Sequence, residues 1–117
     1  MRQLYLVDNS VTQRIHRASS VACGVAALLT TGEFASCLPQ VLEEGFSARS
    51  AAEHRAILDA NRQAKVFLPP DADVARLALD LQTTLFAAGQ GRSVGVLQLA
   101  ATAIRYPDSD QRVTVVH

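Results

Sequence analysis

Residues Leu4–Ser10 read LYLVDNS, and this short segment carries the main information about the fold. Four apolar residues in succession are too few for a free-standing helix and are typical of a strand that is buried on both faces, as in a parallel sheet. The run stops at Asp8, so a carboxylate stands at the carboxyl end of the strand, where ligands bind in open α/β sheets. Asp8 is therefore either a functional carboxylate or a cap for the next helix, because Asp, Asn and Ser are all good caps.

The length and composition of the chain limit the kinds of protein that it can be. At 117 residues it is expected to form a single domain over residues 1–117. Apolar residues make up 49% of the chain, yet no apolar run approaches the roughly 18 residues that span a bilayer, and no apolar leader follows Met1. We therefore expect a cytoplasmic protein with no membrane partner. The net charge is zero, so no global field attracts nucleic acid. Cys23 and Cys37 lack metal-ligand spacing, and both are expected to be reduced and buried.

Strands and helices are expected to alternate along the rest of the chain. After the first strand, strands are predicted at 34–38, 65–68 and 112–116, and helices at 10–17, from Ser19 or Ser20 to 29, 39–46, 51–64, from Asp71 or Asp73 to 88, and 97–106. Gly32 and Gly89 are expected to follow helix ends. This order predicts an α/β fold, a three-layer sandwich with a central, mainly parallel, Rossmann-like sheet.

Acidic residues fall where such a fold has its ligand edge. Asp8 ends the first strand, and Glu43 and Glu44 lie on the helix after the second strand. Carboxylates a few Å apart do not all stay ionised unaided, and a divalent cation resolves the repulsion. Mg²⁺ takes one or two carboxylates with water and phosphate oxygens, and supports phosphodiester cleavage. The alternative is that Glu43 and Glu44 form a solvated helix face.

Three segments together resemble the PIN-domain family, in particular the VapC-type ribonuclease toxins of bacterial toxin–antitoxin pairs. They are Leu6–Ser10 (LVDNS), Pro39–Ser50 (PQVLEEGFSARS) and Leu99–Ala103 (LAATA), and the middle one is the most specific. The resemblance runs through nearly the whole chain with coherent order. It implies a PIN-like fold and a Mg²⁺- or Mn²⁺-dependent endoribonuclease that acts on structured RNA such as tRNA or rRNA. It also implies a homodimer that a cognate antitoxin holds inactive.

The resemblance implies roles for individual residues. Asp8 and Glu43 correspond to catalytic, metal-binding acids, and Ser10 to a hydroxyl that supports Asp8 or the water at the metal. Asn9 and Arg92 are expected to contact the substrate, and Glu44 is expected to be a neighbour of the site and not a ligand.

Two departures from the family pattern affect the expected activity. The third acid of the family directly precedes the LAATA helix, where this chain has Val96. The fourth follows the last strand, where this chain ends at His117, so the family's C-terminal strand and helix are expected to be missing. Asp108 and Asp110 are expected at the opposite end of that strand. Two acids alone predict weak metal binding and slow or absent cleavage.

Two rival functions follow from the same residues. One is a binding module, a PIN fold that has lost cleavage and binds an antitoxin-like peptide or RNA. The other is a phospho-acceptor domain, which needs a Lys at the carboxyl edge, whereas the single Lys of this chain, Lys65, begins a strand. The three histidines, His16, His54 and His117, show no metal spacing. His117 follows the last strand, so it either lies near the site or has the structural role that is usual for a His at a strand end.

Overall fold

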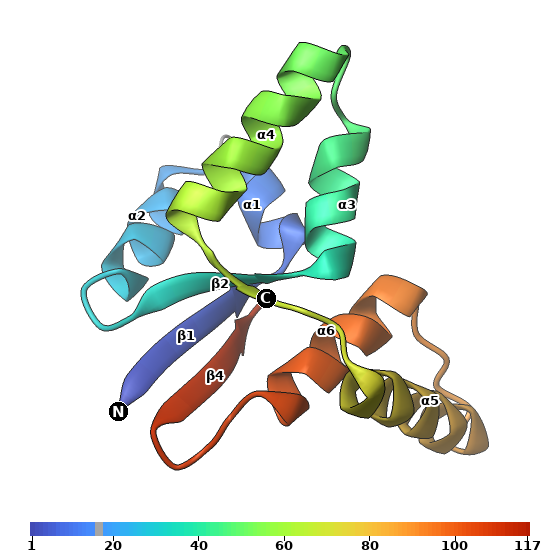
Figure 1. Ribbon diagram of the computed structural model, residues 1–117. Coiled ribbons are helices and arrows are strands. Elements are labelled where there is room, and N and C mark those ends of the chain that lie inside the picture. Colours follow the sequence, from blue (N-terminus) through green and yellow to red (C-terminus); the bar gives the residue numbers. More distant parts are fainter. Residues whose placement is uncertain (16–17) are drawn as a thin grey trace.

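A sheet of four parallel strands forms the centre of the molecule in this computed structural model, which describes residues 1–15 and 18–117, with the backbone alone for residues 12, 13 and 15. The strands are β1 (Arg2–Val7), β2 (Glu33–Cys37), β3 (Val66–Leu68) and β4 (Gln111–Val116), and they lie in the order β3-β2-β1-β4 (Figure 1). Leu4 and Leu6 of β1 are fully buried. The central parallel strand predicted from the apolar run is therefore confirmed.

Helices flank the sheet and complete the three layers. They are α1 (Asn9–Ile15), α2 (Ser19–Leu28), α3 (Leu38–Phe46), α4 (Ala51–Ala64), α5 (Ala72–Ala87) and α6 (Val94–Arg105). The core formed by Leu4, Leu6 and Cys37 packs against Leu99 and Ala103 of α6. Helices α1 to α4 lie toward the other side of the sheet, and α5 packs on α6 (Figure 1). The predicted α/β sandwich is confirmed.

Side-chain caps begin most of the predicted helices. Ser50 Oγ accepts the Glu53 N–H at the start of α4, and Asp71 Oδ1 accepts the Val74 N–H at the start of α5. Gly89 follows α5 with φ +71°, a left-handed conformation that glycine adopts without strain. These caps depend only on residues close in the sequence, and so the predicted starts of α4 and α5 and the predicted end of α5 agree closely with the structure.

Two helix starts differ from the prediction. Helix α2 begins after Ala18 with no side-chain cap, so the predicted cap by Ser19 or Ser20 is wrong. Helix α6 begins at Val94 and not at Leu97, because Ser93 Oγ accepts the Val96 N–H and the helix then runs through Gly95. The earlier start brings the first turn of α6 to the carboxyl edge of the sheet.

The two cysteines lie in different surroundings. Cys37 is 1% exposed at the end of β2, as predicted, but Cys23 is exposed on α2. The prediction that Cys23 is buried was wrong because α2 has no fully buried residue. Within the described residues, no helix is long and apolar enough to cross a membrane.

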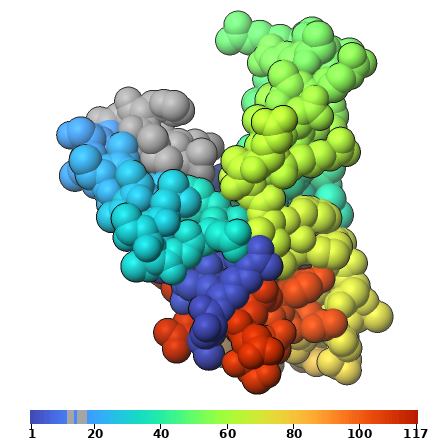
Figure 2. All heavy atoms as spheres, turned by 60° about the vertical axis from the view of Figure 1, so that its left-hand side comes forward, coloured from blue at the N-terminus to red at the C-terminus, as the bar shows by residue number. Residues whose placement is uncertain are grey.

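Helices α3 and α4 form a hairpin that stands out from the sheet (Figure 2). Its two helices are joined by Glu44 of α3, which accepts hydrogen bonds from Asn61 Nδ2 at 2.9 Å and Lys65 Nζ at 3.2 Å. These partners are partly or fully buried, so the contact is partly shielded from solvent. The hairpin therefore has a fixed base, and it is this base that carries Glu43.

Candidate active site

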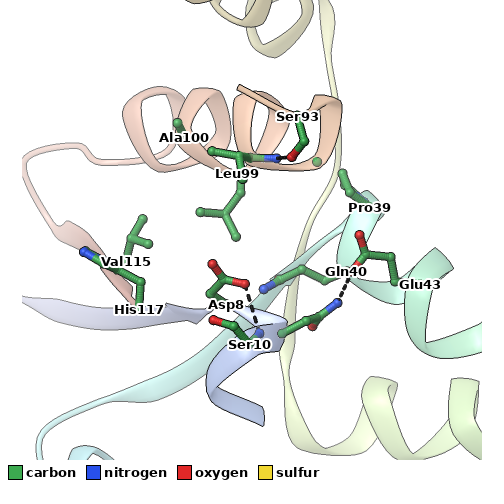
Figure 3. A pocket seen from close by; sticks show the side chains of 13 residues that line it. Asp8, Ser10, Pro39, Gln40, Glu43, Ser93, Leu99, Ala100, Val115 and His117 are labelled. Carbon is green, nitrogen blue, oxygen red and sulfur yellow. Dashed lines mark hydrogen bonds between the residues drawn. The ribbon is translucent and has the colours of Figure 1, made fainter. Parts of the chain in front are cut away.

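A pocket of about 600 Å³ opens at the carboxyl ends of β1 and β4 (Figure 3). Its walls come from the start of α1, from α3, from the first turn of α6 and from the end of β4. Its polar lining comprises Asp8, Asn9, Ser10, Gln40, Glu43, Ser93 and His117. Asp8 and Glu43, which are 35 positions apart in the chain numbering, thus line the same pocket.

Asp8 is held by the backbone on both sides. Its N–H donates to the Val116 carbonyl of β4 at 2.8 Å, and its Oδ1 accepts the Ser10 N–H at 3.1 Å. The second bond satisfies an N–H in the first turn of α1, as a cap does. Within the described residues, Oδ2 makes no hydrogen bond. One oxygen of Asp8 therefore stabilises the helix start while the other remains available in the pocket.

Glu43 is exposed on α3 and is oriented by Asn9. Its Oε2 accepts a hydrogen bond from Asn9 Nδ2 at 2.5 Å. Its Oε1 faces the first turn of α6, since a Cβ added to Gly95 would lie 3.5 Å from it. The carboxylate thus lies near the N-terminal end of α6, the positive end of the helix dipole.

The other predicted residues of the site have different environments. Ser10 is exposed and lines the pocket. Asn9 also lines it, but its amide holds Glu43. Arg92 lies in the exposed loop before α6, and its guanidinium donates to the Gly91 carbonyl at 3.0 Å; it is not among the described residues that line the pocket. The roles predicted for these residues stay predictions.

Gln40 is a pocket residue that the sequence reasoning missed. It is 6% exposed in the first turn of α3, where its Oε1 accepts the Cys37 N–H. Its Nε2 donates to the Val7 carbonyl at the end of β1. The capping-box spacing, with Gln three residues after the N-cap, was a signal for the first contact.

Residues expected outside the site do lie outside it. Glu44 is paired with Lys65 at the base of the α3–α4 hairpin. The Asp110 carbonyl accepts the Arg2 N–H at the start of β1, the end of the sheet opposite to the pocket. His54 lies against Gly45, because a Cβ added at residue 45 would be 3.0 Å from His54 Nε2. Of the two alternatives for His117, the structure supports a place near the site, because His117 lines the pocket. His16 lies outside the described residues.

The donors in the pocket suit a hard, well-hydrated divalent cation. Carboxylate and hydroxyl oxygens are the ligands that Mg²⁺ prefers, and it commonly takes only one or two carboxylates, with water and phosphate oxygens for the rest. Asp8 and Glu43 supply that number. In the described part of the chain, no three His, Cys, Asp or Glu side chains come together as a metal cage. The nearby Cys37 thiol is not a competing soft ligand, because burial raises its pKa and keeps it protonated.

Solved structures of VapBC2, VapBC-1 and FitAcB contain chains with the same fold. VapBC2 from Rickettsia felis, bound to a DNA fragment from their promoter, has a chain that is 12% identical with a TM-score of 0.69, over 97% of this chain and 99% of that chain. A chain of VapBC-1 from nontypeable Haemophilus influenzae is 16% identical with a TM-score of 0.66, over 95% of this chain and 84% of that chain. A chain of FitAcB from Neisseria gonorrhoeae is 15% identical with a TM-score of 0.65, over 93% of this chain and 95% of that chain.

These likenesses, all at low sequence identity, concern the fold. They agree with the predicted PIN-like α/β architecture over almost the whole chain. No protein-family model and no curated protein matches the sequence.

Proposed function

We propose that this chain is a VapC-like toxin component and acts as a Mg²⁺- or Mn²⁺-dependent endoribonuclease on structured RNA such as tRNA or rRNA. The observation that carries the proposal is that Asp8 and Glu43 line one pocket at the carboxyl edge of a parallel sheet. The shared fold with chains of VapBC structures supports a role in a toxin–antitoxin pair.

The residues in and near the pocket have different roles in this proposal. Asp8 and Glu43 would hold the cation, which supplies charge neutralisation at the phosphate and a more acidic water. Asn9 fixes the orientation of Glu43 through their hydrogen bond. The exposed Ser10 hydroxyl, which lines the pocket, is proposed to support Asp8 or the water at the cation. The exposed Arg92 guanidinium, in the loop before α6, is proposed to contact the RNA backbone.

Cleavage of labelled total RNA by the purified protein tests this proposal. We expect cleavage with Mg²⁺ or Mn²⁺, none with EDTA, and a loss of at least about 100-fold in Asp8→Asn and Glu43→Gln, because each removes a proposed ligand. Asp80→Asn is the matched control, since Asp80 is an exposed carboxylate on α5. Cleavage that survives EDTA, or that is equal in Asp8→Asn and the unchanged protein, rejects the nuclease.

A second candidate function is a PIN-fold binding module without turnover. Gly95 and Val96 occupy the first turn of α6, so the pocket has two carboxylates where the family pattern has more. The module predicts RNA or antitoxin-peptide binding in fluorescence anisotropy with no RNA cleavage in Mn²⁺. Turnover by the same 117-residue protein excludes it.

The proposed partners can be tested apart from catalysis. A cognate antitoxin is expected to be encoded by a small neighbouring frame, to co-purify with this chain and to inhibit cleavage. A homodimer in the cytoplasm is proposed on the resemblance alone, and analytical ultracentrifugation of the purified protein distinguishes it from a monomer.

A further inference from the structure

Gln40 stands where the hydrogen-bond ladder between β1 and β2 ends. The register pairs Leu6 with Ala35, so the next rung of this parallel ladder would join the Cys37 N–H to the Val7 carbonyl. Instead, the Cys37 N–H donates to Gln40 Oε1 at 3.1 Å, and Gln40 Nε2 donates to the Val7 carbonyl at 2.5 Å. One side-chain amide thus takes the place of one backbone rung and separates the two strand ends.

The peptide group that Gln40 binds is the one that leads into Asp8. The Val7 carbonyl and the Asp8 N–H belong to the same planar unit. That N–H donates to the Val116 carbonyl of β4 at 2.8 Å, while Gln40 binds the carbonyl on the other side. The unit is held at both poles, and so the backbone that carries the Asp8 carboxylate has little freedom to rotate.

Gln40 also lies on the helix that carries the second acid. Gln40 and Glu43 are three residues apart on α3, a spacing that puts both on one face of the helix. Figure 3 shows the Gln40 side chain extending from α3 toward the end of β1, between Asp8 and Glu43. Because Gln40 is 6% exposed and both halves of its amide bind the backbone, its amide acts on the position of other groups and not as a ligand.

We propose that Gln40 is a positioning residue that sets the separation of Asp8 and Glu43 and, through it, the affinity of the pocket for a divalent cation. The inference rests on the proposed function, since it assumes that these two carboxylates act on one cation. It adds that Gln40, which contacts neither the cation nor the RNA, determines how tightly Asp8 and Glu43 bind the cation.

Mn²⁺ binding to the purified protein tests this role without the need for activity. Gln40→Met keeps the length of the side chain and removes both hydrogen bonds, and Gln40→Asn keeps the amide but is too short to span both partners. Gln63→Met is the matched control, because Gln63 is exposed on α4. Val74→Ala is the stability control, because Val74 is 2% exposed on α5 and is not among the described residues that line the pocket. Free Mn²⁺ is measured by its electron paramagnetic resonance signal, and folding by thermal unfolding.

We expect both Gln40 variants to bind Mn²⁺ about tenfold more weakly than the unchanged protein, as for other residues that orient metal ligands. Gln63→Met and Val74→Ala are expected to bind as the unchanged protein does. Equal Mn²⁺ binding by a folded Gln40 variant overturns the inference and leaves the proposed function standing. Asp8-dependent Mn²⁺ binding without RNA cleavage overturns the nuclease and leaves the role of Gln40 standing. A chain that binds no Mn²⁺ overturns both.

Discussion

Gly95 lies directly against Glu43: a Cβ added at residue 95 would be 3.5 Å from Glu43 Oε1, an ordinary van der Waals contact. The first turn of α6 therefore has room for a side chain that points at the pocket. With glycine at this place, the first turn of α6 brings no third acid beside the Glu43 carboxylate.

Gly95→Asp is expected to strengthen Mn²⁺ binding by about tenfold, because a third carboxylate is added beside Glu43 and near the favourable N-terminus of a helix. Without the cation the new charge repels Glu43, so we expect a small fall in thermal stability that Mn²⁺ reverses. Titration of the protein with Mn²⁺ checks this, with Gly95→Ala as the control for size. Unchanged affinity in Gly95→Asp would show that the cation does not bind between these groups.

Gly32 and Gly24 are expected to respond in opposite ways to substitution by alanine. A Cβ at Gly32 would lie 2.5 Å from the Gln3 carbonyl oxygen of β1, so Gly32→Ala should destabilise the protein by about 1–3 kcal/mol. Gly24 is inside α2 with nothing within 4 Å of its Cβ position, so Gly24→Ala should stabilise it by about 0.5–1 kcal/mol. Urea unfolding measures both, and a neutral Gly32→Ala would contradict this packing of β1 against the loop before β2.

The two thiols are expected to react at different rates. Cys23 is exposed and should react with Ellman's reagent in the native protein at pH 8. Cys37 is 1% exposed, and burial raises its pKa, so it should react only after unfolding. One equivalent of thionitrobenzoate per chain should be released quickly from the unchanged protein, and none from Cys23→Ser. Rapid reaction of both would mean that the end of β2 is open to solvent.

Asp71 should make stability depend on pH. The Val74 N–H is the main cause that lowers the pKa of this N-cap carboxyl, and Arg105 adds to it. A lowered pKa in the folded state stabilises the protein fully above the unfolded value of about 3.9, and this contribution is lost as pH falls through the folded value. The difference in Tm between the unchanged protein and Asp71→Asn should therefore narrow from pH 6 toward pH 2. A constant difference in thermal scans would contradict a contribution from the charge.

The sequence predicted the sheet and most helices because their signals are local. The apolar run before Asp8 specifies a buried strand, and Ser50 and Asp71 cap their helices three residues from their partners. The start of α6 was placed too late, since Ser93 and Gly95 read as loop residues. The cap by Ser93 and the packing on the sheet outweigh the low helix propensity of Gly95.

The candidate site was predicted only in part, because several of its contacts are distant in sequence. The strand-end position identified Asp8 and the resemblance identified Glu43. The bond between Asn9 and Glu43 spans 34 positions, and the bond between Gln40 and Val7 spans 33. No periodicity or spacing within one segment encodes such pairs. They follow from the way α3 is set against the end of β1, which only the tertiary structure defines.

The pairing of the first and last strands has a consequence for how the protein is made. The register runs from Arg2↔Gln111 to Val7↔Val116, and the Val116 carbonyl receives the Asp8 N–H. The ribosome synthesises β1 first, yet β1 gains its neighbour β4 only when Gln111–Val116 has also emerged. The pocket is thus assembled only after both segments have left the ribosome, so any activity that depends on it cannot begin on a nascent chain that still lacks β4.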